Sequence, residues 1–160
     1  MASSTSQAYP DGPQLTKPPV ARRTAHYTCL DALGKGTYGI CYKVVHNGGG
    51  SPCVMKVVPL SGLSSKDIKA AFLEAMLLRT VKHPHVVGYH DAWVENSHLY
   101  IVMEYCSEGD LAQLLKAHHL PAQDIWGFAR DICCGLEHLH KNKIMHRCPS
   151  PCSTRSCPTI

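Results

Sequence analysis

The chain has 160 residues, enough for one ordinary domain, and 44% of them are hydrophobic, so most of the chain is expected to fold. Its formal net charge is +4, with lysines and arginines spread along the sequence, which excludes the basic patch of a nucleic-acid-binding protein. No stretch approaches the ~20 apolar residues that a membrane-spanning helix needs. The polar residues 1–7 lack an apolar signal core, so we expect an intracellular, cytoplasmic protein whose nine cysteines are reduced.

Residues 1–26 are rich in proline, serine and threonine. This composition buries too little apolar surface to offset the entropy lost on ordering, and it predicts a flexible leader, with a docking tail as the alternative. From residue 27 onward, short runs rich in Val, Ile, Tyr and Cys alternate with glycines. They predict three antiparallel strands joined by hairpins, at residues 27–33, 40–46 and 52–58.

The apolar period changes at residues 64–81, which are expected to form an amphipathic helix with a capped start at Ser64. The residues of this segment that should face the sheet recur at steps of three and four: Ile68, Ala71, Phe72, Ala75 and Leu78. Two more strands are predicted near residues 86–94 and 99–104, followed by a short helix at residues 111–118.

A longer helix is predicted to begin at Pro121, a residue suited to the first turn of a helix. Its apolar stripe consists of Ile125, Phe128, Ala129, Ile132, Leu136 and Leu139. The order of elements predicts an α+β fold, in which a five-stranded antiparallel sheet with one packed helix is followed by two helices. Residues 148–160 are rich in cysteine and proline and have no regular period, which indicates an unrelated tail.

The first motif with chemical meaning is G-x-G-x-x-G, formed by Gly34, Gly36 and Gly39. In dinucleotide-binding folds this motif opens a helix, whereas here the predicted strand 40–46 follows it, so dinucleotide binding is excluded. A glycine hairpin between strands can fold over phosphate oxygens, because its backbone N–H groups are not obstructed by side chains. A purely structural hairpin is the alternative.

Two charged residues accompany the glycines. Lys56 ends the apolar run of the third predicted strand, where its ammonium could lie beneath the glycine loop. Glu74 lies close to the apolar positions of the helix 64–81, and a carboxylate in that position needs a partner. We predict that Lys56 is this partner.

The glycine loop, Lys56 and Glu74 together resemble the N-lobe of a eukaryotic protein kinase. The strings HPHVVGY at residues 83–89 and YCSEGDL at residues 105–111 are most similar to the NIMA-related (NEK) serine/threonine kinases. The resemblance covers residues 27–147, with the N-lobe at 27–105 and the hinge and start of the C-lobe at 106–147. It implies ATP as ligand with Mg²⁺, a protein substrate or partner, and a cytoplasmic location that extends to the cytoskeleton or nucleus.

The resemblance also implies roles for single residues. Lys56 and Glu74 would be the catalytic ion pair, and the glycine loop would cover the phosphates. The residues implied to hold the adenine and ribose are Leu33, Cys41, Val54, Met103, Glu104, Cys106 and Asp110. Within this set Cys41 replaces the usual valine, Met103 would be the gatekeeper, and the backbone of Glu104 and Cys106 would bind the adenine edge. Leu78, Tyr89 and His146 would form the column that links the helix to the catalytic loop.

The resemblance fails inside the catalytic loop. His146 and Arg147 match its beginning, but Cys148 stands where the family has the aspartate that accepts the substrate proton. The asparagine and second aspartate that hold Mg²⁺ in the family are not found in the sequence either. His146, Cys148, Cys152 and Cys157 match no common zinc spacing, so no metal site is predicted. We therefore expect this chain to be catalytically inactive.

Two hypotheses follow for the function. The first is a truncated form of a serine/threonine kinase, in which an alternative exon, a frame change or a faulty gene model alters the sequence after Arg147. The second is a non-catalytic interaction module that competes with the full-length kinase for partners. In either case the apolar stripe of the helix after Pro121 would lack its usual cover, which predicts a marginally stable or partner-dependent protein.

Overall fold

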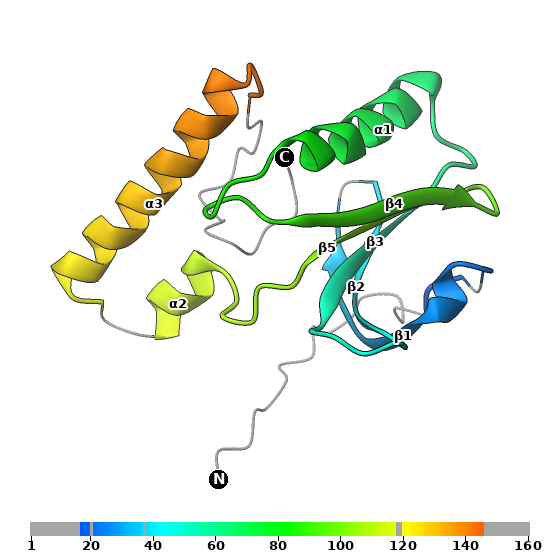
Figure 1. Ribbon diagram of the computed structural model, residues 1–160, viewed down its shortest axis with the longest axis horizontal. Helices are drawn as coiled ribbons and strands as arrows, with labels where there is room; N and C mark the ends of the chain where they lie inside the picture. Colours follow the sequence, from blue (N-terminus) through cyan, green and yellow to red (C-terminus); the bar gives the residue numbers. More distant parts are fainter. Residues whose placement is uncertain (1–16, 20, 37, 118–119, 146–160) are drawn as a thin grey trace, which may run out of the picture.

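The computed structural model describes residues 17–19, 21–36, 38–117 and 120–145 (Figure 1). Its centre is one antiparallel sheet of five strands, in the order β1-β2-β3-β5-β4. The strands are β1 (Tyr27–Lys35), β2 (Ile40–His46), β3 (Cys53–Pro59), β4 (Tyr89–Glu95) and β5 (His98–Glu104). The predicted α+β fold is confirmed, and β2 begins and ends where the sequence predicted.

Three α-helices accompany the sheet: α1 (Ser65–Thr80), α2 (Leu111–Ala117) and α3 (Ala122–Lys141). The predicted cap of α1 is present, because the Ser64 side chain accepts a hydrogen bond from the Asp67 backbone N–H at 3.2 Å. Figure 1 shows α1 lying along the sheet beside β4, whereas α2 and α3 follow the last strand and lie away from the sheet. None of the helices within the described ranges is long and apolar enough to cross a membrane.

The sheet buries apolar side chains on both faces. The face toward α1 contains the cluster Val54, Val58, Ala71, Ala75, Leu78, Leu99, Ile101 and Met103. The opposite face contains Ala21, Tyr42, Val44, Met55, Val57, Trp93, Tyr100 and Val102. Strand residues alternate between these faces, as expected for a sheet that is covered on both sides.

Two details of the predicted elements are wrong. Phe72 does not face the sheet with its neighbours but is 39% exposed, because the buried side of α1 is a narrow stripe through Ala71, Ala75 and Leu78. Strand β4 begins at Tyr89 and not near residue 86. The residues before it form a loop, and Val86 packs there against a separate small cluster.

The segment before β1 differs from the prediction of a flexible leader that extends to residue 26. A short 3-10 helix, η1 (Thr24–His26), leads into β1, and Ala21 is buried in the sheet core. The backbone N–H groups of Arg22 and Arg23 donate to the Glu95 carboxylate at 2.6 and 3.0 Å. These contacts attach the segment to β4, far away in the sequence. Residues 1–16, and the predicted tail 148–160, lie outside the described residues.

Candidate functional site

Lys56 and Glu74 meet as the sequence predicted. The Lys56 Nζ lies 2.6 Å from the Glu74 Oε1, and the two side chains are 2% and 12% exposed. Lys56 sits between Cys41 of β2 and Ile101 of β5 in the strand register, so its side chain emerges on the face that α1 covers. An ammonium this deeply buried requires an opposite charge, since an unpaired buried charge is strongly destabilising.

The glycine loop joins β1 to β2 and passes over β3. The Gly36 N–H donates to the Gly39 carbonyl at 2.7 Å, which closes the turn. A Cβ atom at Gly39 would lie 2.2 Å from the Val57 carbonyl oxygen, so only glycine allows the loop to rest on the strand that carries Lys56. A Cβ atom at Gly36 would meet nothing closer than 3.7 Å, so its surroundings are open.

The predicted adenine-binding side chains lie on the same face of the sheet as Lys56. Val54 and Met103 are buried and directly opposite each other in the β3–β5 register. Cys41 is half-buried and packs against the same cluster. Leu33, near the end of β1, is exposed. The α1 face of the sheet thus places apolar side chains beside the buried Lys56 ammonium, which suits a ligand with an aromatic base and an anionic group.

The last residue of β5 is hydrogen-bonded to the residue that precedes β4. The Glu104 N–H donates to the Gly88 carbonyl at 2.8 Å, and the Gly88 N–H donates to the Glu104 carboxylate at 3.1 Å. Because its N–H is engaged, an adenine would have to meet Glu104 through the carbonyl. Cys106 is half-buried, and the Asp110 carbonyl accepts from the Leu114 N–H at 3.1 Å at the beginning of α2.

Sequence reasoning missed a contact that supports this segment. The Lys43 ammonium of β2 lies 4.3 Å from the centre of the Tyr105 ring, a cation–π contact. Lys43 belongs to no motif, and it is far from Tyr105 in the sequence, so only the register of β2, β3 and β5 brings the two residues together. Tyr105 also packs against the cluster on the α1 face.

The two described residues of the predicted column, Leu78 and Tyr89, lie at one apolar cluster. Leu78 of α1 is buried, and Tyr89 at the start of β4 packs against the same cluster. Burial, aided by the nearby Asp91 carboxylate, raises the pKa of the Tyr89 phenol, so the group stays neutral at physiological pH. His146 and Arg147, together with the cysteines weighed as zinc ligands, lie outside the described residues. Among the residues the structure describes, no His, Cys, Asp or Glu cluster could hold a metal ion.

Comparison with known proteins decides the family, since the protein kinase domain matches residues 27–148. The chain belongs to the protein kinase family. Serine/threonine-protein kinase Nek3 of Mus musculus is 34% identical over 125 residues, which are 76% of this chain but 24% of the relative. Nek5 of Homo sapiens is 34% identical over 124 residues, which are 76% of this chain and 18% of the relative. Nek4 of Mus musculus is 36% identical over 127 residues, which are 77% of this chain and 16% of the relative.

These relatives confirm the resemblance to NIMA-related kinases. The kinase chain described here spans about a quarter or less of the length of these three relatives. In the kinase fold the strand lysine and the helix glutamate form the ion pair on which productive nucleotide binding depends. In this chain Lys56 of β3 and Glu74 of α1 form an ion pair between a strand lysine and a helix glutamate.

Proposed function

We propose that this chain binds ATP between its glycine loop and the apolar surface of β3 and β5, with the Lys56 ammonium on the phosphates. We also propose that the complete kinase transfers the terminal phosphate of ATP to serine or threonine of a protein. The observation that carries the proposal is the 2.6 Å contact between the buried Lys56 and Glu74. The pair holds a positive charge next to a glycine loop, where phosphates would need it.

The residues of the site fit the parts of ATP. Val54 and Met103 are buried apolar neighbours of the place proposed for the base, and the open surroundings of Gly36 leave room for phosphates. Bound ATP would supply the phosphoryl group, while the protein supplies position and charge. Mg²⁺ accompanies ATP in the family, and here it would arrive on the phosphates.

We further propose that this chain does not itself transfer phosphate. Cys148 follows His146 and Arg147 where the family has an aspartate. A thiol with an ordinary pKa of about 8.5 is mostly protonated at pH 7 and does not replace a carboxylate that accepts the proton of a hydroxyl. ATP binding and phosphoryl transfer are therefore separate predictions for this chain. Its cytoplasmic location also stays a prediction.

A second candidate function is a non-catalytic module that competes with the full-length kinase for a protein partner. The observation that favours it is the exposure of two large apolar side chains near the start of α3, since Ile125 and Trp126 are 49% and 75% exposed. Exposed apolar side chains of this size are available to a partner surface. The two candidates are compatible, because one concerns the sheet and the other α3.

Calorimetric titration of the 160-residue chain with ATP and Mg²⁺ tests the first proposal. We expect saturable binding that weakens at least about tenfold in Lys56→Met, because the ammonium that meets the phosphates is gone. Lys69→Met, which removes an exposed lysine from α1, is the matched control and should bind like the unchanged chain. Equal affinity in all three proteins would contradict the proposed site.

An assay for transfer of labelled phosphate to a generic protein substrate tests the proposal that this chain does not itself transfer phosphate. We expect no turnover by the chain under conditions in which ATP binds. Turnover that Lys56→Met abolishes would overturn the inactive assignment while leaving the ATP site in place.

A further inference from the structure

Among the described residues, the C-terminal half of α3 packs against the loop at residues 81–88, between α1 and β4, and against Leu77 near the end of α1 (Figure 1). The apolar part of this contact is smaller than either core of the sheet: Val81, Leu139 and Ile144 are buried there, and Leu77, Val86 and Leu136 are partly buried against them. Gly135 allows the close approach, because a Cβ atom at this position would lie 2.9 Å from the His85 carbonyl oxygen. With so small an apolar area, polar groups at the contact have a large share in deciding whether it holds.

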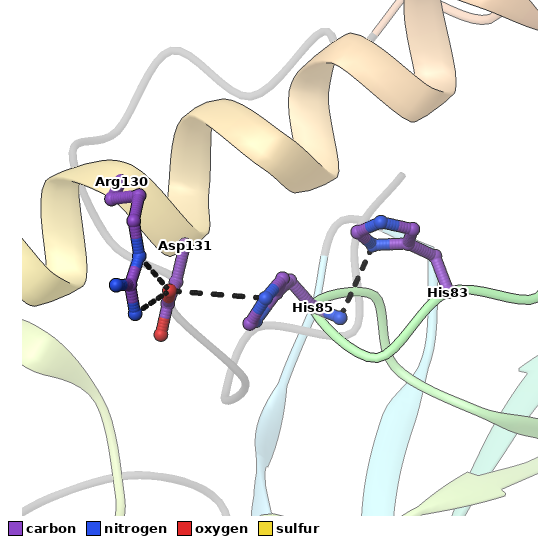
Figure 2. Close-up of polar contacts among 4 residues, drawn as sticks. All are labelled: His83, His85, Arg130 and Asp131. Carbon is purple, nitrogen blue, oxygen red and sulfur yellow. Dashed lines mark hydrogen bonds and ion pairs between the residues drawn. The ribbon is translucent and has the colours of Figure 1, made fainter.

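Histidines surround this contact. The ring of His83 in the loop stacks on the ring of His138 in α3, with centroids 4.8 Å apart and planes at 24°. The ring of His85 lies 5.4 Å from that of His83. Figure 2 shows the His85 backbone N–H donating to the Nδ1 of His83, at 3.2 Å. An Nδ1 that accepts a hydrogen bond belongs to a neutral imidazole, because a protonated ring has two N–H donors and no acceptor.

We propose that this contact is a pH-sensitive latch, which holds α3 on the loop 81–88 while His83 and His138 are neutral and releases it when they are protonated. Protonation of His83 removes the acceptor for the His85 N–H. Protonation of both rings places a positive charge on each of two stacked rings, and these charges repel each other. The Asn142 Nδ2 lies 3.4 Å from the His138 Nε2, and a protonated ring would no longer accept from it.

Acidic groups on α3 would attract a protonated histidine and therefore oppose this release. The strength of that attraction decides whether protonation releases α3 or holds it on the loop. Asp131 lies 3.8 Å from the His85 Nε2, but it already accepts two hydrogen bonds from Arg130, at 3.0 and 3.1 Å (Figure 2). Glu137 also acts on His83, but it is paired with Lys141 at 2.9 Å. These ion pairs are partly or largely exposed, and such pairs contribute little. We therefore expect protonation of the histidines to release α3 from the loop.

The pKa of His83 points in the same direction. Desolvation lowers it below the usual value, and the neighbouring His138 and His85 lower it further, against an opposing effect of Glu137. A base whose pKa is lower in the docked state than in the free state contributes its full stability above the free value of about 6.5. That contribution is lost as the pH falls from about 6.5 through the lower pKa of the docked state. The latch is thus closed at neutral pH and opens in mild acid.

Hydrogen exchange of the full chain, corrected for the intrinsic rate at each pH, tests the latch at about pH 7.5 and about pH 5.5. We expect protection of residues 81–88 and 135–144 to fall in acid, by no more than about tenfold per pH unit for each proton taken up. Protection of β3 and β5 should not change. Unchanged protection of both segments between the two pH values would overturn the proposal.

Two variants test whether the histidines of the contact cause the pH dependence. His138→Phe keeps an aromatic ring in the stack but cannot be protonated, so its segments should stay protected in acid to a greater extent than in the unchanged chain. His140→Phe removes an exposed histidine of the same helix and should retain the full pH dependence. Equal loss of pH dependence in both variants would overturn the proposal.

Gly135→Ala supplies a test that does not depend on how His138→Phe folds. The added methyl group would press on the His85 carbonyl and open the contact at both pH values. We expect low protection of residues 81–88 that no longer changes with pH. If the contact opens and the pH dependence remains, the histidine contact is not its source and the proposal is wrong. Neither outcome depends on whether the chain binds ATP.

Discussion

The sheet with α1 and the helix α3 differ in how much of their apolar surface is covered. In the sheet, Ile101 is 0% exposed and has covered faces on both sides of its strand, whereas Ile125 of α3 is 49% exposed. The sheet unit therefore has a core of its own, and its ion pair lies inside that core. Helix α3 is held on the rest of the molecule by one small apolar cluster and a contact between histidines. The candidate nucleotide site belongs to the part of the molecule that has its own core, whereas α3 is attached through a smaller apolar cluster.

The two isoleucines give the sharpest form of this comparison. Ile101→Ala should lower the free energy of unfolding by about 4 kcal/mol, because it leaves a cavity in a closed core. Ile125→Ala should change it by less than about 0.5 kcal/mol, because the side chain is already half in water. Urea denaturation followed by circular dichroism measures both. Similar losses of unfolding free energy in the two variants would show that Ile125 of α3 is covered to the same extent as Ile101 of the sheet.

Two glycines of the loop test how closely the site rests on the sheet. Gly39→Ala should destabilise the protein by about 2 kcal/mol, because the methyl group would collide with the Val57 backbone. Gly36→Ala is the matched control and should cost less than about 1 kcal/mol, since the space around it is open. Thermal unfolding of the two variants measures the difference. If both variants melt together, the loop does not rest on β3 as described.

A substitution in the segment before β1 should lower the stability of the protein by a smaller amount. The Arg23 guanidinium lies 2.6 Å from Asp91 and 4.7 Å from the centre of the Trp93 ring, and both contacts are lost in Arg23→Ala. We expect a loss of about 1 kcal/mol, which decreases in high salt because the ion pair is exposed. Arg22→Ala keeps the backbone N–H that bonds Glu95 and should have almost no effect. Equal losses from both variants would contradict this assignment.

Local patterns in the sequence predicted the elements that build the site. Alternating strand residues and the three- and four-residue steps of α1 placed Lys56 and Glu74 on facing surfaces, so their contact followed from short-range information. The same patterns could not show that Phe72 is 39% exposed, because that depends on how far α1 is rotated against the sheet.

Contacts between distant residues escaped prediction for a similar reason. Arg23 meets Asp91, and His85 meets Gly135, only because of the way in which complete elements pack. No motif or period links the two residues of either pair, and composition alone suggested a flexible leader where Ala21 is buried.

The central claim is that Lys56 and Glu74 act as one unit in holding a nucleotide. A double-mutant cycle on ATP affinity tests it most directly, with Lys56→Met, Glu74→Gln and the double variant measured by calorimetry. We predict that the double variant binds ATP no more weakly than Lys56→Met alone, because Glu74 acts only through the lysine. Losses that add in the double variant would show that the two residues act separately and would contradict the account.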